Sequence, residues 1–305
     1  MKKRKRKLNK NFVKAVCALL ALVILIAVCV LFRYYPHYLK NKAPIVLENA
    51  QSEEIKIMSY NVRCLTPLDS GKKHWYYRAD LVMSDIEAEA PGIIGFQEAT
   101  KWQYRYLVDC MPQYDSVITY RDKSIASEGC PIFYNTELFT LIDKGSFWLS
   151  ETPDKMSKDW GSACYRICSY VILTENASGK DFVVFNTHLD HVSDEARING
   201  IQVVLDKIKE FGGLPAVIMG DLNAEVGSQT YVSVTEHFMD AQYAATDAES
   251  NVTYQGWGQA EGKRIDYFMV SKTGFWVYTY DVLAETHDGV HSSDHNPIVM
   301  TAVLE

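Results

Sequence analysis

The segment from Leu214 to Glu225 combines a short apolar run with polar residues that could take part in catalysis. The run Leu214 to Met219 ends at Gly220, a pattern typical of a buried strand followed by a loop. The carboxylate of Asp221 could accept a proton from water, and Asn223 could donate to a phosphoryl oxygen. Taken alone, Asp-Leu-Asn would equally suit a turn after a strand.

Five further polar motifs lie near the ends of predicted strands, in the order Ser59-Tyr60-Asn61, Gln97-Glu98, Asn186-Thr187-His188-Leu189-Asp190, Arg264-Ile265-Asp266-Tyr267-Phe268 and Ser293-Asp294-His295-Asn296. The identity and order of these motifs resemble the endonuclease/exonuclease/phosphatase superfamily, the metal-dependent phosphoesterases related to pancreatic-type deoxyribonuclease. The resemblance runs from about Ile55 to Val303. Each motif is weak by itself, whereas the complete series in order is specific.

The resemblance implies a site for Mg²⁺ or Mn²⁺. In it, Glu98 is the principal ligand, Asn61 assists and Asp294 completes the set. Carboxylate and amide oxygens are the ligands that these hard cations prefer.

The resemblance also implies the catalytic residues. His295 contacts the scissile phosphate and Asp266 orients its ring, while the protonation state of His295 stays open. Asp221 orients or deprotonates the attacking water, Asn223 holds the phosphate, and His188 lies on the other side of the phosphate.

Several neighbouring residues allow two readings, as substrate contacts or as ordinary ion pairs: Asp190, His191, Arg197, Arg166 and Arg264. Arg63 departs from the family, because some DNA-repair members have an acidic residue two positions beyond the matching asparagine. The long signature of inositol-polyphosphate 5-phosphatases around Asp266 is also missing.

The elements that would position these residues are strands mixed with a few helices. Strands are predicted at Ile55–Tyr60, Ile93–Phe96 and Phe139–Leu141, and a hairpin joins Cys168–Leu173 to Phe182–Phe185. Helices are predicted at Arg78–Glu89, Lys101–Met111 and after Ser193, where Ile198, Ile201, Leu205 and Ile208 form one apolar face. This content predicts an α+β fold, and the resemblance implies a four-layer α/β/β/α sandwich with two packed mixed sheets.

The N-terminal segment has the character of a membrane anchor. Eight basic residues precede the uncharged run Ala15–Phe32, whose 18 residues would span about 27 Å as a helix. The positive-inside rule then predicts a single-pass cell-membrane protein with a cytoplasmic N-terminus and an extracytoplasmic catalytic domain. The predicted segments are the N-terminus (1–14), a retained transmembrane signal anchor (15–32), a linker (33–54) and the catalytic domain (55–305).

Charge limits the class of substrate. Eleven of the 31 basic residues lie in the first 42 positions, so the remainder carries 20 basic against 38 acidic residues, a net charge of about −18. Such a domain repels polyanions at long range and is unsuited to tracking nucleic acid through a basic groove. Five cysteines beyond the apolar run show no zinc spacing and favour buried thiols, although one disulfide would be possible.

Three functions follow from these patterns. The first is a tethered Mg²⁺-dependent phosphodiesterase or phosphatase acting on a small phosphoester or a lipid head group. The second is an extracellular nuclease on the same fold, acting on nucleic acid. The third is a catalytically inactive domain that binds phosphate or lipid. No protein partner is implied.

Overall fold

The computed structural model describes residues 9–45, 47 and 54–305, without the side chains at 30–34 and 36–37. The chain divides into two compact units, Met1–Ala43 and Pro44–Glu305, which are described separately. Positions 1–8 of the predicted basic N-terminus and positions 46 and 48–53 of the predicted linker lie outside the described residues.

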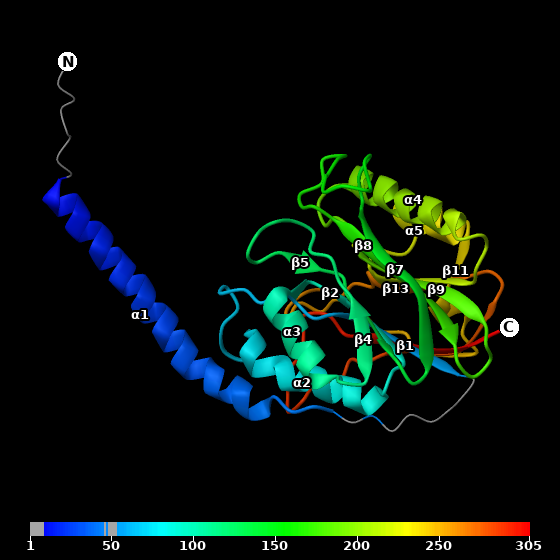
Figure 1. Ribbon diagram of the computed structural model, residues 1–305, viewed down its shortest axis with the longest axis horizontal. Coiled ribbons are helices and arrows are strands. Elements are labelled where there is room, and N and C mark those ends of the chain that lie inside the picture. The colour runs from blue at the N-terminus through cyan, green and yellow to red at the C-terminus, as the bar shows by residue number, and fades with distance from the viewer. Residues whose placement is uncertain (1–8, 46, 48–53) are drawn as a thin grey trace, which may run out of the picture. The chain divides into compact units, whose positions relative to one another are not determined.

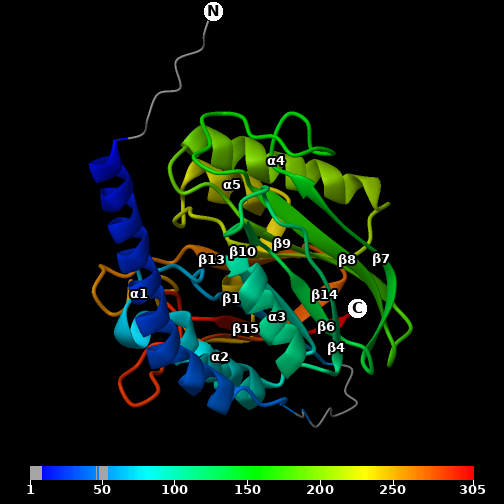
Figure 2. The ribbon, with the colours of Figure 1, turned by 60° about the vertical axis from the view of Figure 1, so that its left-hand side comes forward.

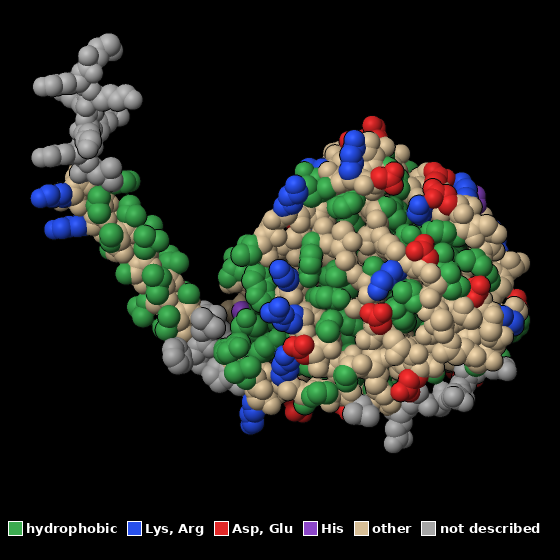
Figure 3. Space-filling model, viewed as in Figure 1, with side chains coloured by type: hydrophobic (Ala, Val, Ile, Leu, Met, Phe, Trp, Pro, Cys, Tyr) green, Lys and Arg blue, Asp and Glu red, His purple; other side chains and the backbone are tan. Residues whose placement is uncertain are grey.

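The first unit is a helix, α1 (Lys10–Asn41), which Asn9 caps by accepting a hydrogen bond from the backbone of Asn11. Hydrophobic side chains gather along it (Figure 3). In the described part of the chain it is the one helix long and apolar enough to cross a membrane, a property that a signal sequence shares. The helix continues beyond Phe32, the predicted end of the membrane segment, so the start of the predicted linker is helical.

The second unit is built on two large β-sheets. The seven-stranded sheet has the order β12-β14-β15-β1-β2-β6-β4. Its strands are β1 (Ile55–Asn61), β2 (Ile93–Gln97), β4 (Tyr114–Val117), β6 (Ile132–Asn135), β12 (Asp247–Ala248), β14 (Phe275–Val282) and β15 (Ile298–Leu304). Strands β1 and β2 are parallel, and β15 runs antiparallel to β1.

The six-stranded sheet has the order β11-β13-β10-β9-β8-β7. Its strands are β7 (Phe139–Trp148), β8 (Ile167–Glu175), β9 (Asp181–His188), β10 (Ala216–Asp221), β11 (Phe238–Asp240) and β13 (Asp266–Ser271). A separate short ribbon pairs β3 (Ala99–Thr100) with β5 (Glu128–Gly129).

The two sheets pack face to face, and helices cover their outer faces (Figures 1 and 2). The helices are α2 (Trp75–Glu89), α3 (Lys101–Cys110), α4 (Asp194–Glu210), α5 (Gln229–Thr235), α6 (Ala241–Ala244) and the 3₁₀ helix η1 (Gly71–Lys73). Apolar residues of both sheets, such as Ile57 and Val217, share one buried core, while Ile201 and Leu205 of α4 belong to a second core on the six-stranded sheet. The predicted α+β four-layer sandwich is therefore confirmed.

Two local predictions need correction. Strand β7 extends to Trp148 rather than Leu141, because a bulge after Leu141 interrupts the alternation from which strands are read. Polar residues then follow on this edge strand, where exposed charges are common. In addition, Ile45 and Leu47 of the predicted linker are buried in the second unit, where Ile45 donates its backbone N–H to the carbonyl of Cys110.

Candidate active site

The register of the strands brings the predicted residues to one end of the sandwich. In the six-stranded sheet Asp221 pairs directly with His188 on one side and with Asp266 on the other. In the seven-stranded sheet Asn61 ends β1, and Glu98 follows β2 immediately. His295 lies just before β15, so the residues come from both sheets and meet at one end of the sandwich.

Close backbone contact at Gly220 sets the position of Asp221. A Cβ at Gly220 would lie 2.0 Å from the carbonyl oxygen of Thr187, and its φ of +132° lies in a region that side chains disfavour. Only glycine allows β9 and β10 to approach this closely beside His188. Glu98 has a φ of +61°, so a non-glycine residue is held in a left-handed conformation at the site, as strained functional residues often are.

Asn61 connects the two halves of the site through its side-chain amide. Its Nδ2 donates to Asp221 Oδ2 at 3.1 Å and to Glu98 Oε1 at 3.3 Å, and lies 3.5 Å from His295 Nε2. Its Oδ1 accepts from the backbone N–H of Arg63 at 3.0 Å, which leaves one lone pair on that oxygen. Asn61 therefore fixes a carboxylate from each sheet.

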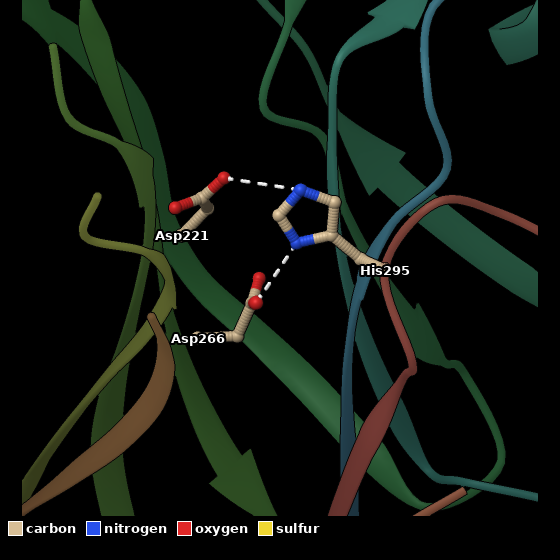
Figure 4. Close-up of side chains that lie close together, drawn as sticks. All are labelled: Asp221, Asp266 and His295. Atoms are coloured by element: carbon tan, nitrogen blue, oxygen red, sulfur yellow. Dashed lines mark hydrogen bonds and ion pairs between the residues drawn. The ribbon is translucent and has the colours of Figure 1, made fainter. Parts of the chain in front are cut away.

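The imidazole of His295 lies between two carboxylates (Figure 4). Its Nδ1 is 2.9 Å from Asp266 Oδ2, and its Nε2 is 3.7 Å from Asp221 Oδ2. Burial by itself would lower the pKa of His295, but the charges of Asp266 and Asp221 raise it to about 10. His295 is therefore an imidazolium at neutral pH, with Asp266 fixing the orientation of its ring.

Asp221 is the carboxylate that faces both histidines. His188 Nε2 lies 3.4 Å from its Oδ2, and the backbone N–H of Asn223 donates to its Oδ1 at 2.8 Å. Burial and the charge of Asp266 raise the pKa of Asp221 to about 7. A carboxylate with a pKa in this range can exchange a proton with water at neutral pH.

His188 has the opposite electrostatic character to His295. Burial, followed by the nearby guanidinium groups of Arg166 and Arg121, holds its pKa well below the usual range. It is therefore neutral and can donate or accept one hydrogen bond at each ring nitrogen.

Glu98 and Asp294 present carboxylate oxygens to the same cavity. Glu98 Oε2 accepts from the backbone N–H of Cys64 at 2.9 Å. Burial and the charge of Glu98 raise the pKa of Asp294, and Arg63 Nε lies 3.8 Å from Asp294 Oδ2. Two carboxylates with one partial counter-ion form an anionic, oxygen-rich pair, which suits a hard divalent cation.

Asp221, Asp266 and His295 also lie close enough together to hold a metal, with ligand atoms within 4.8 Å of one another. Here Nδ1 of His295 is hydrogen-bonded to Asp266, so this nitrogen and this carboxylate are already paired, while Nε2 of His295 lies 3.7 Å from Asp221. The oxygen set of Glu98, Asp294 and Asn61 is the better match to Mg²⁺ or Mn²⁺.

A cavity of about 720 Å³ opens over these groups. Six of the eight predicted site residues line it, namely Glu98, His188, Asp221, Asn223, Asp294 and His295. Asn61 and Asp266 lie behind this surface and support it through hydrogen bonds. Asn223 donates its side-chain amide to the carbonyl of Leu189 at 3.1 Å, which orients the amide at the cavity wall.

The wall also contains residues that the motifs did not indicate, including Arg121, Glu128 and Tyr254. The ring of Tyr254 packs edge-on against His295, with ring centroids 5.0 Å apart. Arg121 and Tyr254 lie in loops and Glu128 in the two-residue strand β5, so no periodic sequence pattern marked them. Of the three arginines with open roles, Arg166 and Arg197 line the cavity, whereas Arg264 pairs with Asp240 at 2.6 Å elsewhere.

Comparison with known proteins agrees with this geometry. The model of the Endonuclease/Exonuclease/phosphatase family matches residues 58–295. The chain belongs to this family, and it is accordingly a metal-dependent phosphoric ester hydrolase.

Solved structures of bacterial members are similar along nearly their whole length. A family member from Bacteroides vulgatus has a TM-score of 0.79 and 31% identity, covering 83% of this chain and 99% of that one. The mannosyl-6-phosphatase Bt3783 of Bacteroides thetaiotaomicron has a TM-score of 0.76 and 31% identity, covering 82% and 99%. The Ccr4 exoribonuclease subunit of Mycosarcoma maydis is 23% identical over 294 residues, covering 76% of this chain but only 43% of that protein.

Proposed function

We propose that this protein is a Mg²⁺-dependent hydrolase of small phosphoesters, tethered to the outer face of the cell membrane. The observation that carries the proposal is a hydrogen-bond network. In it the amide of Asn61 joins Glu98 to Asp221, and Asp221 faces His295. This network connects Glu98, whose carboxylate is suited to binding a metal, with Asp221, whose carboxylate is suited to activating water.

Glu98 and Asp294 would hold the metal, and Asn61 would assist by fixing Glu98 through its side-chain amide. When bound, a divalent cation neutralises charge on the phosphoryl oxygens and stabilises the leaving group. Asp221 orients the attacking water and accepts its proton, since its pKa of about 7 matches neutral conditions.

The phosphate is held by side chains on both sides of Asp221. The imidazolium of His295 donates from Nε2 to a non-bridging oxygen, while Asp266 keeps Nδ1 protonated. Neutral His188 and the amide of Asn223 complete the set of donors on the other side. Fixed donors aimed at developing negative charge are the main source of catalysis in such sites.

A small phosphoester is the proposed substrate class. The similarity to a mannosyl-6-phosphatase at 31% identity supports this choice, and so does the net charge of about −18 beyond residue 42, which repels polyanions. An inactive binding domain would not need the complete catalytic set of Asn61, Glu98, His188, Asp221, Asn223, Asp266 and His295.

The proposed location rests on α1 and on the basic residues before it. By the positive-inside rule, the N-terminus is cytoplasmic and the catalytic unit is outside. The helix serves as a retained anchor in this proposal.

The full-length protein in detergent tests the proposal. It should hydrolyse 4-nitrophenyl phosphate or bis(4-nitrophenyl) phosphate with Mg²⁺ and not with EDTA, and it should be less active on duplex DNA. Glu98→Gln should also weaken Mg²⁺ affinity about tenfold or more, as measured by calorimetry. The melting temperature should stay within about 3 °C, because the substitution removes a charged ligand but no core volume. Unchanged metal affinity would place the ion elsewhere, and activity confined to nucleic acid would favour the nuclease.

A further inference from the structure

Two arginines on the cavity wall have no part in the function proposed above. We propose that Arg121 and Arg166 bind the outer oxygens of a terminal phosphate and make the site selective for phosphomonoesters over phosphodiesters. This inference rests on the proposed function and names its substrate class more closely.

Arg121 is held rigidly from one side. Its Nη1 and Nη2 lie 2.6 and 2.7 Å from the two carboxylate oxygens of Glu128, and its backbone N–H donates to the carbonyl of Glu128 at 2.9 Å. Trp148 Nε1 donates to the carbonyl of Arg121 at 2.9 Å. A guanidinium fixed in this way loses little entropy when it binds an anion.

Arg166 is only 5% exposed and is also held in place by neighbouring side chains. Its Nη2 lies 2.9 Å from His191 Nδ1, and its Nε lies 3.6 Å from Asp190 Oδ2. No hydrogen bond from Nη1 is found within the described residues, although the side chain lines the cavity. One nitrogen of a buried cation therefore remains available to a ligand beside His188.

A second, small recess shares Glu98, Arg121, Glu128, Arg166 and His188 with the main cavity, and its volume is about 10 Å³. That volume holds about one water molecule. A phosphate placed against His188 can carry an ester group toward the main opening, but no second ester group fits on the side of the recess.

Charge favours the same class of substrate. A phosphomonoester carries about −1.5 to −2 at neutral pH, since its second pKa is about 6, whereas a diester carries −1. The additional charge lies on a terminal oxygen, which can accept a charge-assisted hydrogen bond from Nη1 of Arg166. Burial, and after it the charges of Arg166 and Arg121, lower the pKa of His188, so both guanidinium groups lie near this imidazole.

The kinetic test compares 4-nitrophenyl phosphate with bis(4-nitrophenyl) phosphate, using the full-length protein in detergent with saturating Mg²⁺. Arg121→Met and Arg166→Met should each lower kcat/KM for the monoester by about 10- to 100-fold, the effect of losing one charge-assisted hydrogen bond, and change that for the diester by less than about threefold. Arg166→Lys should restore part of the monoester rate. Arg105→Met, at an exposed position of α3, is the control and should change neither.

Equal losses on both substrates would overturn the inference, because a merely structural role affects both alike. A binding measurement on the unaltered protein does not depend on the folding of variants. Calorimetry should show that inorganic phosphate binds at least about tenfold more tightly than dimethyl phosphate, and equal affinities would overturn the inference. If the protein hydrolyses no phosphoester yet keeps this preference, the proposed function fails and the monoester subsite stands.

Discussion

At the scale of single residues, the site depends on a few shared hydrogen bonds. The amide of Asn61 donates hydrogen bonds to both Glu98 and Asp221, so a change in the position of one carboxylate also changes the hydrogen bond to the other. Since buried polar networks contribute more than the sum of their pairs, these residues should act as a unit.

The pair of His295 and Asp266 allows a test of the predicted pH dependence. Asp266 raises the pKa of His295, so the imidazolium persists up to about pH 10 and is lost above it. Asp266→Asn removes that anion and should move the alkaline limb of the kcat/KM profile about 1 to 3 pH units lower. Profiles from pH 6 to 11 measure the shift.

The double variant is the control for this pair. If Asp266 acts by orienting His295, adding Asp266→Asn to His295→Ala should cost little beyond the single His295 change. Fully additive losses together with an unmoved alkaline limb would show that the two residues work independently.

Most of the central residues could be predicted because each follows a short apolar strand within a few positions. Glu98 follows β2 and Asp221 ends β10, so both are marked locally. Arg121 and Glu128 could not be predicted, because β5 reaches the site by pairing with β3, a contact between segments about 30 residues apart. Such non-local pairing leaves no periodic signal in one sequence.

At the scale of elements, the parallel pair of β9 and β10 determines how close His188 and Asp221 come. This pair requires the bare backbone of Gly220 against Thr187. The helices and strands with clear periodicity were predicted well, as in α4, which begins after the Ser193 cap. Strand β7 was predicted too short because the bulge shifted its alternation.

Gly220→Ala tests the role of this contact. The new Cβ would lie 2.0 Å from the carbonyl oxygen of Thr187, so the strands must separate. We expect a loss of about 2 to 4 kcal/mol in the free energy of unfolding and a larger loss of activity, because Asp221 and His188 move apart. Chemical denaturation and kcat/KM measure both effects.

Gly179→Ala is the matched control. Gly179 also has a positive φ, +71°, but no heavy atom lies within 4 Å of the position of its Cβ. This change should cost about 1 kcal/mol and leave turnover unchanged. Equal effects of the two substitutions would mean that backbone strain, and not the close approach of the strands, explains Gly220.

At the scale of the whole molecule, a family fold is joined to an N-terminal apolar helix. The order of polar motifs was sufficient to predict the family. The boundary of the catalytic unit was predicted less well. Ile45 and Leu47 belong to the short apolar run 43–47 and are buried in this unit, where Ile45 donates its backbone N–H to the carbonyl of Cys110 at the end of α3.

The proposed topology predicts that the catalytic unit is accessible from outside the cell. Protease added to spheroplasts should digest the region beyond residue 45, while a cytoplasmic marker protein stays intact until detergent is added. Protection of the catalytic unit under conditions that degrade an exported control protein would contradict this orientation.

The most direct test of the central claim is the turnover of Asp221→Asn with saturating Mg²⁺ on whichever phosphoester the unaltered protein hydrolyses best. Asparagine keeps the volume of the side chain but cannot accept a proton from water, so we expect kcat to fall about 10²- to 10⁴-fold. A kcat within about threefold of the unaltered protein would show that Asp221 does not activate the water and would contradict the account.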